Sequence, residues 1–347
     1  MSVRIIQGDC RDVLKTLPDE SVHCVVTSPP YWGLRDYGVG GQIGLEDSPA
    51  AFVSEMVSVF SEVRRVLRSD GTLWLNLGDS YAGGGNYRGV NSEATLTSKQ
   101  RSNGGARGLS QALGAAGKDF GLEPKNLVGI PWRVAFALQA AGWYLRQDII
   151  WSKPNPMPES VRDRCTKAHE YLFLLAKSER YYFDQDAILE PVAESSVERL
   201  SQPTLGQQAG SDRVPGKTNG PMKAVGRASG DTYTARAYSS PQSEPRGPNN
   251  NFGAPEKRNK RSVWTVTKQP FKEAHFATFP PDLIEPCILA GCPEDGTVLD
   301  PFGGAGTTGL VADRHKRNAI LIELNPEYAS MARKRIYNDA PLFADVA

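Results

Sequence analysis

A glycine-rich segment near the C-terminus has the residue types and the spacing that suit a nucleoside-containing ligand. Residues 299–309 are Leu-Asp-Pro-Phe-Gly-Gly-Ala-Gly-Thr-Thr-Gly, between an expected strand at 297–299 and an expected helix from about 307 to 315. Glycine lets the backbone approach a ligand closely, and a helix N-terminus attracts electronegative groups. Glu323 ends the next expected strand, 19 residues after Gly304 (323 − 304), where a carboxylate can accept both hydroxyls of a ribose. Taken alone, the pattern fits NAD, FAD or an adenosyl cofactor.

The position of this turn in the chain separates these cofactors. A dinucleotide-binding fold that began at Leu299 would need about four or five further strands, but only 24 residues follow Glu323 (347 − 323). The remaining strands must come from the N-terminal part of the chain. We therefore expect a circularly permuted sheet.

A second segment, Val25-Val26-Thr27-Ser28-Pro29-Pro30-Tyr31-Trp32, follows a β-branched run that predicts a buried strand. The two prolines carry no N–H and fix the backbone, so that carbonyl groups point outward at a strand end, where open α/β sheets have their active sites. An aromatic amine is a poor nucleophile, because its lone pair is delocalised into the ring. Hydrogen bonds from its two hydrogens to Ser28 Oγ and a backbone carbonyl would favour a tetrahedral, nucleophilic nitrogen. Tyr31 could stack on a base swung out of a duplex. Taken alone, the segment is explained more simply as a turn that packs Tyr31 and Trp32 into a core.

The two segments together resemble the motifs of DNA amino-methyltransferases. Thr27 to Tyr31 resembles their catalytic motif, (Asp/Asn/Ser)-Pro-Pro-(Tyr/Phe/Trp), and Asp300-Pro301-Phe302-x-Gly-x-Gly resembles their cofactor motif. The order, with the catalytic motif first, is similar to the permuted group called beta. The resemblance covers roughly Val3–Asp184 and Ser262–Tyr337.

This resemblance implies S-adenosyl-L-methionine as the cofactor and double-stranded DNA as the substrate, with methyl transfer to an exocyclic amine of a flipped base. It implies a catalytic role for Ser28, Pro29, Pro30 and Tyr31. It also implies a cofactor-binding role for Asp9, Phe279, Asp300, Phe302, Gly303, Gly304, Gly306, Thr307 and Glu323.

Three shorter segments also resemble family motifs. Gln7–Cys10 resembles the segment that lies against the cofactor adenine, and His275–Pro280 the motif that closes over the methionine half. Trp151–Pro158 resembles the loop that flanks the target-base pocket. We therefore expect Trp32, Lys153 and Asn155 to bind the substrate. Ser28, in place of Asp or Asn, resembles the cytosine-N4 motif, so cytosine N4 is favoured narrowly over adenine N6.

Other functions fit parts of the sequence less well. An NAD-dependent oxidoreductase has no use for a Pro-Pro-Tyr loop. A cytosine-C5 methyltransferase needs a nucleophilic thiol, but the only Pro-Cys pair, Pro286-Cys287, lies in an apolar helical pattern that predicts a buried cysteine. A non-catalytic DNA-binding protein would lack a cofactor pocket. Methylation of RNA stays open, whereas the basic insertion described below argues against a protein substrate.

Composition excludes several classes of protein. Lys and Arg number 40 against 39 Asp and Glu, so any affinity for DNA must come from a local cluster. The five cysteines and four histidines are scattered, which argues against a structural metal site and for reduced thiols. No apolar run approaches the roughly 20 residues that span a bilayer. We expect a cytoplasmic protein of bacterial or phage origin. A homodimer and a cognate restriction enzyme stay open.

Two segments interrupt the alternation of helices and strands. Residues 83–121 are rich in Gly, Ser and Asn and predict a mobile loop. Residues 190–261 are poor in apolar side chains, and between 201 and 261 ten basic residues outnumber four acidic ones, a net charge of +6 (10 − 4). Local positive charge with interleaved aromatics is what contact with DNA requires, so we expect a target-recognition insertion. Its densest basic cluster, expected to bind phosphates, is Lys257, Arg258, Lys260 and Arg261.

The expected fold is α/β, a Rossmann-like class I methyltransferase with a doubly wound, mostly parallel and circularly permuted sheet. Residues 1–189 are expected to form the catalytic half, 190–261 the insertion and 262–347 the cofactor-binding half.

Overall fold

The computed structural model describes residues 2–34, 38–82, 121–200, 257–268, 279–339 and 345–346. The chain divides into two compact units, Met1–Tyr182 with Ser262–Ala347, and Phe183–Arg261. Each unit is considered by itself. The expected mobile loop and most of the expected insertion lie outside the described residues, and the division at 189/190 and 261/262 stays a prediction.

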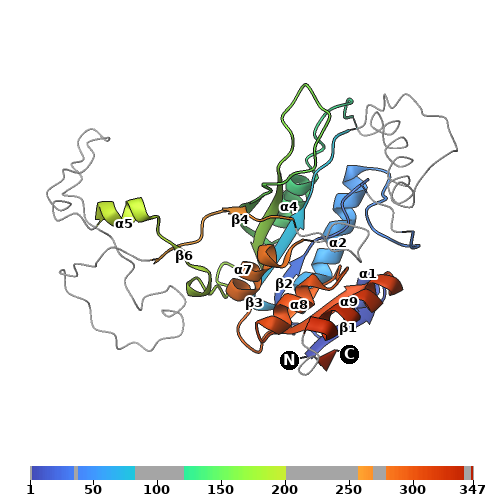
Figure 1. The fold of residues 1–347 in the computed structure, drawn as a ribbon. Helices are drawn as coiled ribbons and strands as arrows, with labels where there is room; N and C mark the ends of the chain where they lie inside the picture. The colour runs from blue at the N-terminus through green and yellow to red at the C-terminus, as the bar shows by residue number, and fades with distance from the viewer. Residues whose placement is uncertain are drawn as a thin grey trace. The chain divides into compact units, whose positions relative to one another are not determined.

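A nine-stranded sheet forms the centre of the first unit (Figure 1). Neighbouring strands pair in parallel, except that β5 is antiparallel to both β3 and β4. Their order across the sheet is β11 (Asp345–Val346), β1 (Ser2–Gln7), β10 (Asn318–Glu323), β9 (Thr297–Asp300), β2 (Val22–Thr27), β3 (Leu67–Leu77), β5 (His169–Ala176), β4 (Tyr144–Ser152) and β8 (Val263–Thr265). The C-terminal strands β9 and β10 thus lie between the N-terminal strands β1 and β2. This is the predicted permuted, mostly parallel sheet.

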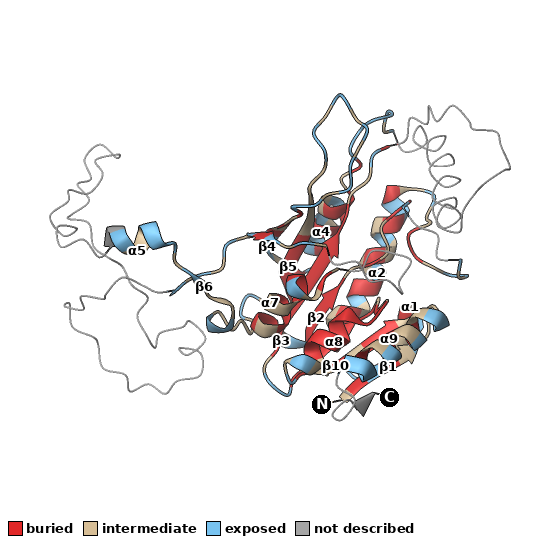
Figure 2. Cartoon of the chain, viewed as in Figure 1, coloured by how far each residue is buried: buried red, intermediate tan, exposed pale blue. Residues whose placement is uncertain are grey.

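Helices cover the sheet on both sides, as a doubly wound fold requires. The first set packs against the apolar cluster that contains Val25, Leu73 and Phe173; it consists of α1 (Cys10–Thr16), α2 (Pro49–Val66) and α4 (Ile130–Ala140). The second set consists of α7 (Pro281–Gly291), α8 (Thr307–Arg314) and α9 (Pro326–Asp339). The last residue of α7 lies against Cys24 and Trp74, whose side chains point to the opposite face. The central strands β9, β2, β3 and β5 are largely buried (Figure 2).

Helix α2 illustrates why these residues form these elements. Ser48 Oγ caps its N-terminus by accepting from Ala51 N at 3.1 Å, and Pro49 occupies the first turn, where a missing N–H costs nothing. Its apolar residues recur at helical spacing and are buried: Phe52, Met56, Val59, Phe60, Val63 and Val66.

Strand β3 begins earlier than its sequence suggests. The pair Asp70-Gly71 is typical of a turn, whereas β3 begins at Leu67. The pairing shows the reason: Val22 pairs with Leu67 and Cys24 with Thr72, so several residues of β3 bulge out of register opposite one residue of β2. Among the helices of the described residues, none has the length and apolar character needed to cross a bilayer.

In the second unit, β6 (Glu190–Pro191) pairs antiparallel with β7 (Lys257–Arg258), so the two ends of the described part of the expected insertion meet. A short 3-10 helix, η1 (Asp186–Ile188), precedes β6, and helix α5 (Glu194–Leu200) follows it.

Candidate functional site

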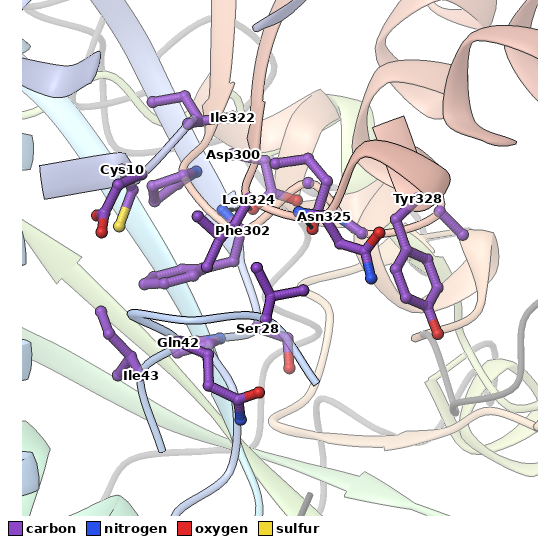
Figure 3. A pocket seen from close by; sticks show the side chains of 18 of the residues that line it. Cys10, Ser28, Gln42, Ile43, Asp300, Phe302, Ile322, Leu324, Asn325 and Tyr328 are labelled. Atoms are coloured by element: carbon purple, nitrogen blue, oxygen red, sulfur yellow. Dashed lines mark hydrogen bonds between the residues drawn. The ribbon is translucent and has the colours of Figure 1, made fainter. Parts of the chain in front are cut away.

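A cavity of about 160 Å³ lies at the carboxyl ends of β1, β2, β9 and β10 (Figure 3). These strands are parallel neighbours, so the loops that follow them converge at one edge of the sheet. The lining residues are Gly8, Asp9, Cys10, Ser28, Pro29, Tyr31, Val39, Gly41, Gln42, Ile43, Phe279, Asp300, Pro301, Phe302, Gly303, Gly304, Ala305, Thr307, Ile322, Glu323, Leu324, Asn325 and Tyr328. The glycine-rich turn and the Ser-Pro-Pro-Tyr segment, about 270 residues apart in the sequence, therefore face one cavity.

The carboxylate of Asp300 holds the glycine-rich turn to the strand that carries the Ser-Pro-Pro-Tyr segment. Its Oδ1 accepts from Thr27 Oγ1 at 2.6 Å and from the Phe302 backbone N–H at 3.0 Å, and its Oδ2 accepts from Thr308 Oγ1 at 2.6 Å. The side chain is 1% exposed, and burial raises its pKa to about 6, although the three hydrogen bonds act in the opposite direction. Asp300 thus fixes the turn, as expected. Its contact with the amino-acid end of the cofactor stays a prediction.

Glu323, at the end of β10, holds the turn from the other side. Its Oε2 accepts from the Gly304 backbone N–H at 2.7 Å, and its Oε1 accepts from Asn325 N at 2.8 Å. Gly304 has a φ of +50° and Gly306 a φ of +78°, a conformation that favours glycine. Burial raises the pKa of Glu323. The lone pairs that the two backbone contacts leave free suit the hydroxyls of a ribose.

Residues 39–43 belong to a loop that lines the cavity and is fixed by Arg11. The Arg11 guanidinium donates to the Gly41 carbonyl at 2.6 Å and to Glu55 Oε1 at 2.9 Å, and it forms an ion pair with Asp9. Asp9 also caps α1 by accepting from Arg11 N. The cavity wall formed by Val39, Gly41, Gln42 and Ile43 is thereby tied to the first helix.

Sequence reasoning missed this loop, along with Ile322, Leu324, Asn325 and Tyr328. One signal was present, because residues 38–44 contain four glycines, and three of them, Gly38, Gly41 and Gly44, have positive φ. Ile322, Leu324 and Asn325 lie at or just after the end of β10, and Tyr328 lies in the first turn of α9.

Most of the predicted cofactor and catalytic residues line the cavity, but two do not. Pro30 lies behind the lining. Gly306 is packed against α9, since a Cβ on it would lie 2.8 Å from Ala332 Cβ. Of the predicted motif at 275–280, only Phe279 and Pro280 are among the described residues, and Phe279 lines the cavity.

Two of the residues predicted to bind the substrate require correction. Trp32 is 3% exposed, belongs to the apolar core, and donates from Nε1 to the Glu46 carbonyl at 2.8 Å, so it packs the loop and cannot reach a base. Lys153 is buried and its ammonium is paired with Glu170, so it offers no exposed charge to DNA. Asn155 is exposed, and its Oδ1 accepts from Lys268 N at 3.4 Å.

The basic cluster of the second unit is partly neutralised. Arg258 and Arg261 both pair with Glu190 Oε1, at 3.0 and 2.6 Å. Lys257 is exposed on β7, and Lys260 is half-buried. Within the described ranges, no group of three or more His, Cys, Asp or Glu side chains could hold a metal ion.

Comparison with known proteins agrees with this geometry. The family model described as DNA methylase (N6_N4_Mtase) matches residues 22–334. The type II methyltransferase M.SmaI of Serratia marcescens is 42% identical over 96% of this chain and 91% of its own. Among solved structures, the cytosine-N4-specific PvuII DNA methyltransferase has a TM-score of 0.56 at 17% identity, covering 98% of this chain and 92% of its own. A putative DNA modification methylase of Thermus thermophilus, in complex with S-adenosyl-L-methionine, has a TM-score of 0.54 at 23% identity, covering 99% of both chains.

The chain belongs to the DNA methylase family whose members methylate amino groups at N6 or N4. The predicted class, an S-adenosylmethionine-dependent DNA amino-methyltransferase, is confirmed, and so is the class I fold. The cavity fits this cofactor, since it combines a carboxylate at a strand end, a glycine turn and the apolar side chains of Phe302 and Ile322. The oxidoreductase and C5-methyltransferase alternatives are excluded by the family; Cys287 is indeed buried.

Asp300 should make stability depend on pH. Because its pKa is about 6 in the folded protein, above its usual 3.8, its contribution to the free energy of unfolding is fully present below about pH 4 and is lost as the pH rises through about 6. The excess stability of the wild type over Asp300→Asn should therefore shrink between these pH values. Urea unfolding between these two pH values measures it. Asp12→Asn, an exposed site, is the control, and a pH-independent difference at Asp300 would contradict the buried network.

Proposed function

We propose that this chain is a site-specific DNA methyltransferase that methylates cytosine N4. One observation carries the proposal: the cavity is lined both by the glycine turn with Glu323 and by Ser28, Pro29 and Tyr31. A methyl donor and a target amine could therefore meet in it. The type II names of relatives such as M.SmaI support a role in a restriction–modification system.

In this proposal, different residues of the chain bind the cofactor and the target base. Glu323 and the backbone of the glycine turn hold the nucleoside part of the cofactor, between Phe302 and Ile322. When bound, S-adenosylmethionine would supply a sulfonium methyl group for transfer to the amine nitrogen, with the thioether as the leaving group. Ser28 Oγ and a carbonyl of the Pro29-Pro30 segment accept the two amine hydrogens, and one of these protons leaves to solvent. Tyr31 stacks on the flipped base.

Binding and chemistry should be separable by substitution. Ser28→Ala is expected to keep cofactor affinity but to slow methyl transfer about 10²–10³-fold, a scale taken from oxyanion-hole donors. Glu323→Gln is expected to weaken cofactor binding, because it removes a charged acceptor from the ribose site. Calorimetry measures the affinity and single-turnover transfer of labelled methyl groups measures the rate. Ser61→Ala, on the outer face of α2, is the matched control. Wild-type turnover of Ser28→Ala would overturn the catalytic assignment.

The identity of the target base is the finer part of the proposal. Ser28 supports cytosine N4, and the same two acceptors would also serve adenine N6. DNA methylated by the purified enzyme and digested to nucleosides should contain N4-methylcytosine by mass spectrometry. N6-methyladenine alone would contradict this choice and leave the amino-methyltransferase class intact.

We assign target recognition to residues 190–261, on the strength of the net +6 charge over 201–261. Replacing residues 201–256 with a short Gly-Ser linker keeps β6 paired with β7. This variant is expected to bind cofactor with wild-type affinity and to lose sequence preference, as measured by sequencing the methylated sites in a mixed DNA pool. Retained preference for one site would place recognition elsewhere, and residues 83–121 would be the next segment to delete.

A further inference from the structure

A buried polar network adjoins the Ser-Pro-Pro-Tyr segment and takes no part in the function proposed above. The hydroxyl of Tyr31 lies 2.7 Å from Glu170 Oε2 and 3.1 Å from Asn76 Oδ1. Asn76 is 1% exposed, and its orientation is fixed because Nδ2 donates to the Tyr171 carbonyl at 3.0 Å. Both atoms that face the hydroxyl are therefore acceptors, and the single proton of the phenol must point toward them.

The carboxylate of Glu170 is paired with a buried lysine. Its Oε1 forms an ion pair with Lys153 Nζ, which also lies 4.2 Å from the centre of the Trp151 ring. Lys153 is 6% exposed, and burial lowers its pKa although Glu170 acts in the opposite direction. Removing such a pair from water is costly, and replacing it with apolar residues is often neutral or stabilising. Fold stability alone therefore explains poorly why the pair lies here.

The ring of Tyr31 is confined as well as its hydroxyl. A Cβ on Gly78 would lie 2.4 Å from Tyr31 Cε2 and 2.7 Å from Cδ2, so the ring rests directly on the backbone of Gly78. Asn76 and Gly78 are two positions apart in the same segment, at the carboxyl end of β3. The same segment thus contacts the Tyr31 ring through the backbone of Gly78 and the Tyr31 hydroxyl through the side chain of Asn76.

The antiparallel direction of β5 brings Glu170 to this edge. In the register of the sheet, Trp151 of β4 pairs with Glu170, and Leu77 of β3 pairs with Tyr171. Because β5 runs opposite to its neighbours, its first residues lie beside the last residues of β3 and β4, where Tyr31 follows β2. A strand parallel to β3 and β4 at this position would place its carboxyl end at this edge, and its first residues would lie at the opposite edge.

We propose that Glu170, paired with Lys153 and assisted by Asn76, is a positioning residue that fixes the plane of the Tyr31 ring before DNA binds. The inference rests on the proposed function, in which Tyr31 stacks on the flipped base. A ring held at its hydroxyl and along one edge loses little conformational entropy when the base binds. Because the base stacks on this ring, the target amine is presented to the methyl donor in one orientation. Lys153 then acts through Glu170 and Tyr31, without contacting DNA.

A double-mutant cycle tests the proposal. Tyr31→Phe removes only the hydroxyl and leaves the ion pair intact, whereas Glu170→Gln removes the charged acceptor. Each is expected to lower the single-turnover methyl-transfer rate about tenfold, the scale of one hydrogen bond to a charged group, with unchanged cofactor affinity. The double variant should be no slower than the slower single one, because both remove the same contact. Effects that multiply, or a Tyr31→Phe enzyme with the wild-type rate, would overturn the proposal.

Three further variants test the interpretation. Glu170→Gln leaves the buried ammonium of Lys153 without its partner, which can impair folding, so the combined Lys153→Met, Glu170→Gln variant removes both charges and should match Tyr31→Phe in rate. Glu285→Gln breaks the carboxylate pair with His315, outside the cavity, and is the matched control. Tyr31→Ala distinguishes the stacking role from the positioning role. Full methyl transfer by Tyr31→Ala would overturn the stacking role itself. Loss of transfer by Tyr31→Ala, together with wild-type transfer by Tyr31→Phe, would overturn only the positioning role.

Discussion

The buried carboxylate of Asp300 is the constraint on which the site depends. It joins Thr27, the last residue of β2, to Thr308 in α8 and to the backbone of the glycine turn. A buried carboxylate is tolerated only when donors surround it, and here each donor belongs to a different part of the site. The turn that faces the cofactor and the strand that carries the Ser-Pro-Pro-Tyr segment are therefore positioned by a single side chain.

The other loops of the cavity are secured in the same way, by a carboxyl or guanidinium side chain that reaches irregular backbone or a hydroxyl. Glu323 holds Gly304 and Asn325, Arg11 holds the Gly41 carbonyl, and Glu170 holds the Tyr31 hydroxyl. Regular hydrogen bonding ends where the strands end, so the loops need such partners to keep one conformation. The strands determine where the loops begin, and these contacts determine the conformation of each loop.

The sequence predicted the elements well because burial imposes strong periodicity on them. The expected strand at 297–299 and helix at 307–315 lie close to β9 and α8, and the strands expected before Ser28 and at Glu323 are β2 and β10. Trp32 was misassigned because sequence does not distinguish an aromatic ring in a core from one facing a ligand. Glu170 was missed because its role depends on the direction of β5, which no local pattern encodes. The loop at 38–44 was missed because the residues that line the cavity there follow neither a helical nor a strand pattern of apolar side chains.

The permuted sheet has a consequence for how the chain acquires its structure. Strand β1 pairs with β10 from Val3 with Ala319 to Gln7 with Glu323, and β2 pairs with β9. Neither pairing can form before the C-terminal strands have been synthesised. During synthesis the N-terminal strands emerge hundreds of residues before their neighbours and expose unpaired edges in the meantime. Pairing at such sequence separation slows folding and prolongs exposure to aggregation. The centre of the sheet can close only after β9 and β10, residues 297–323, have been synthesised.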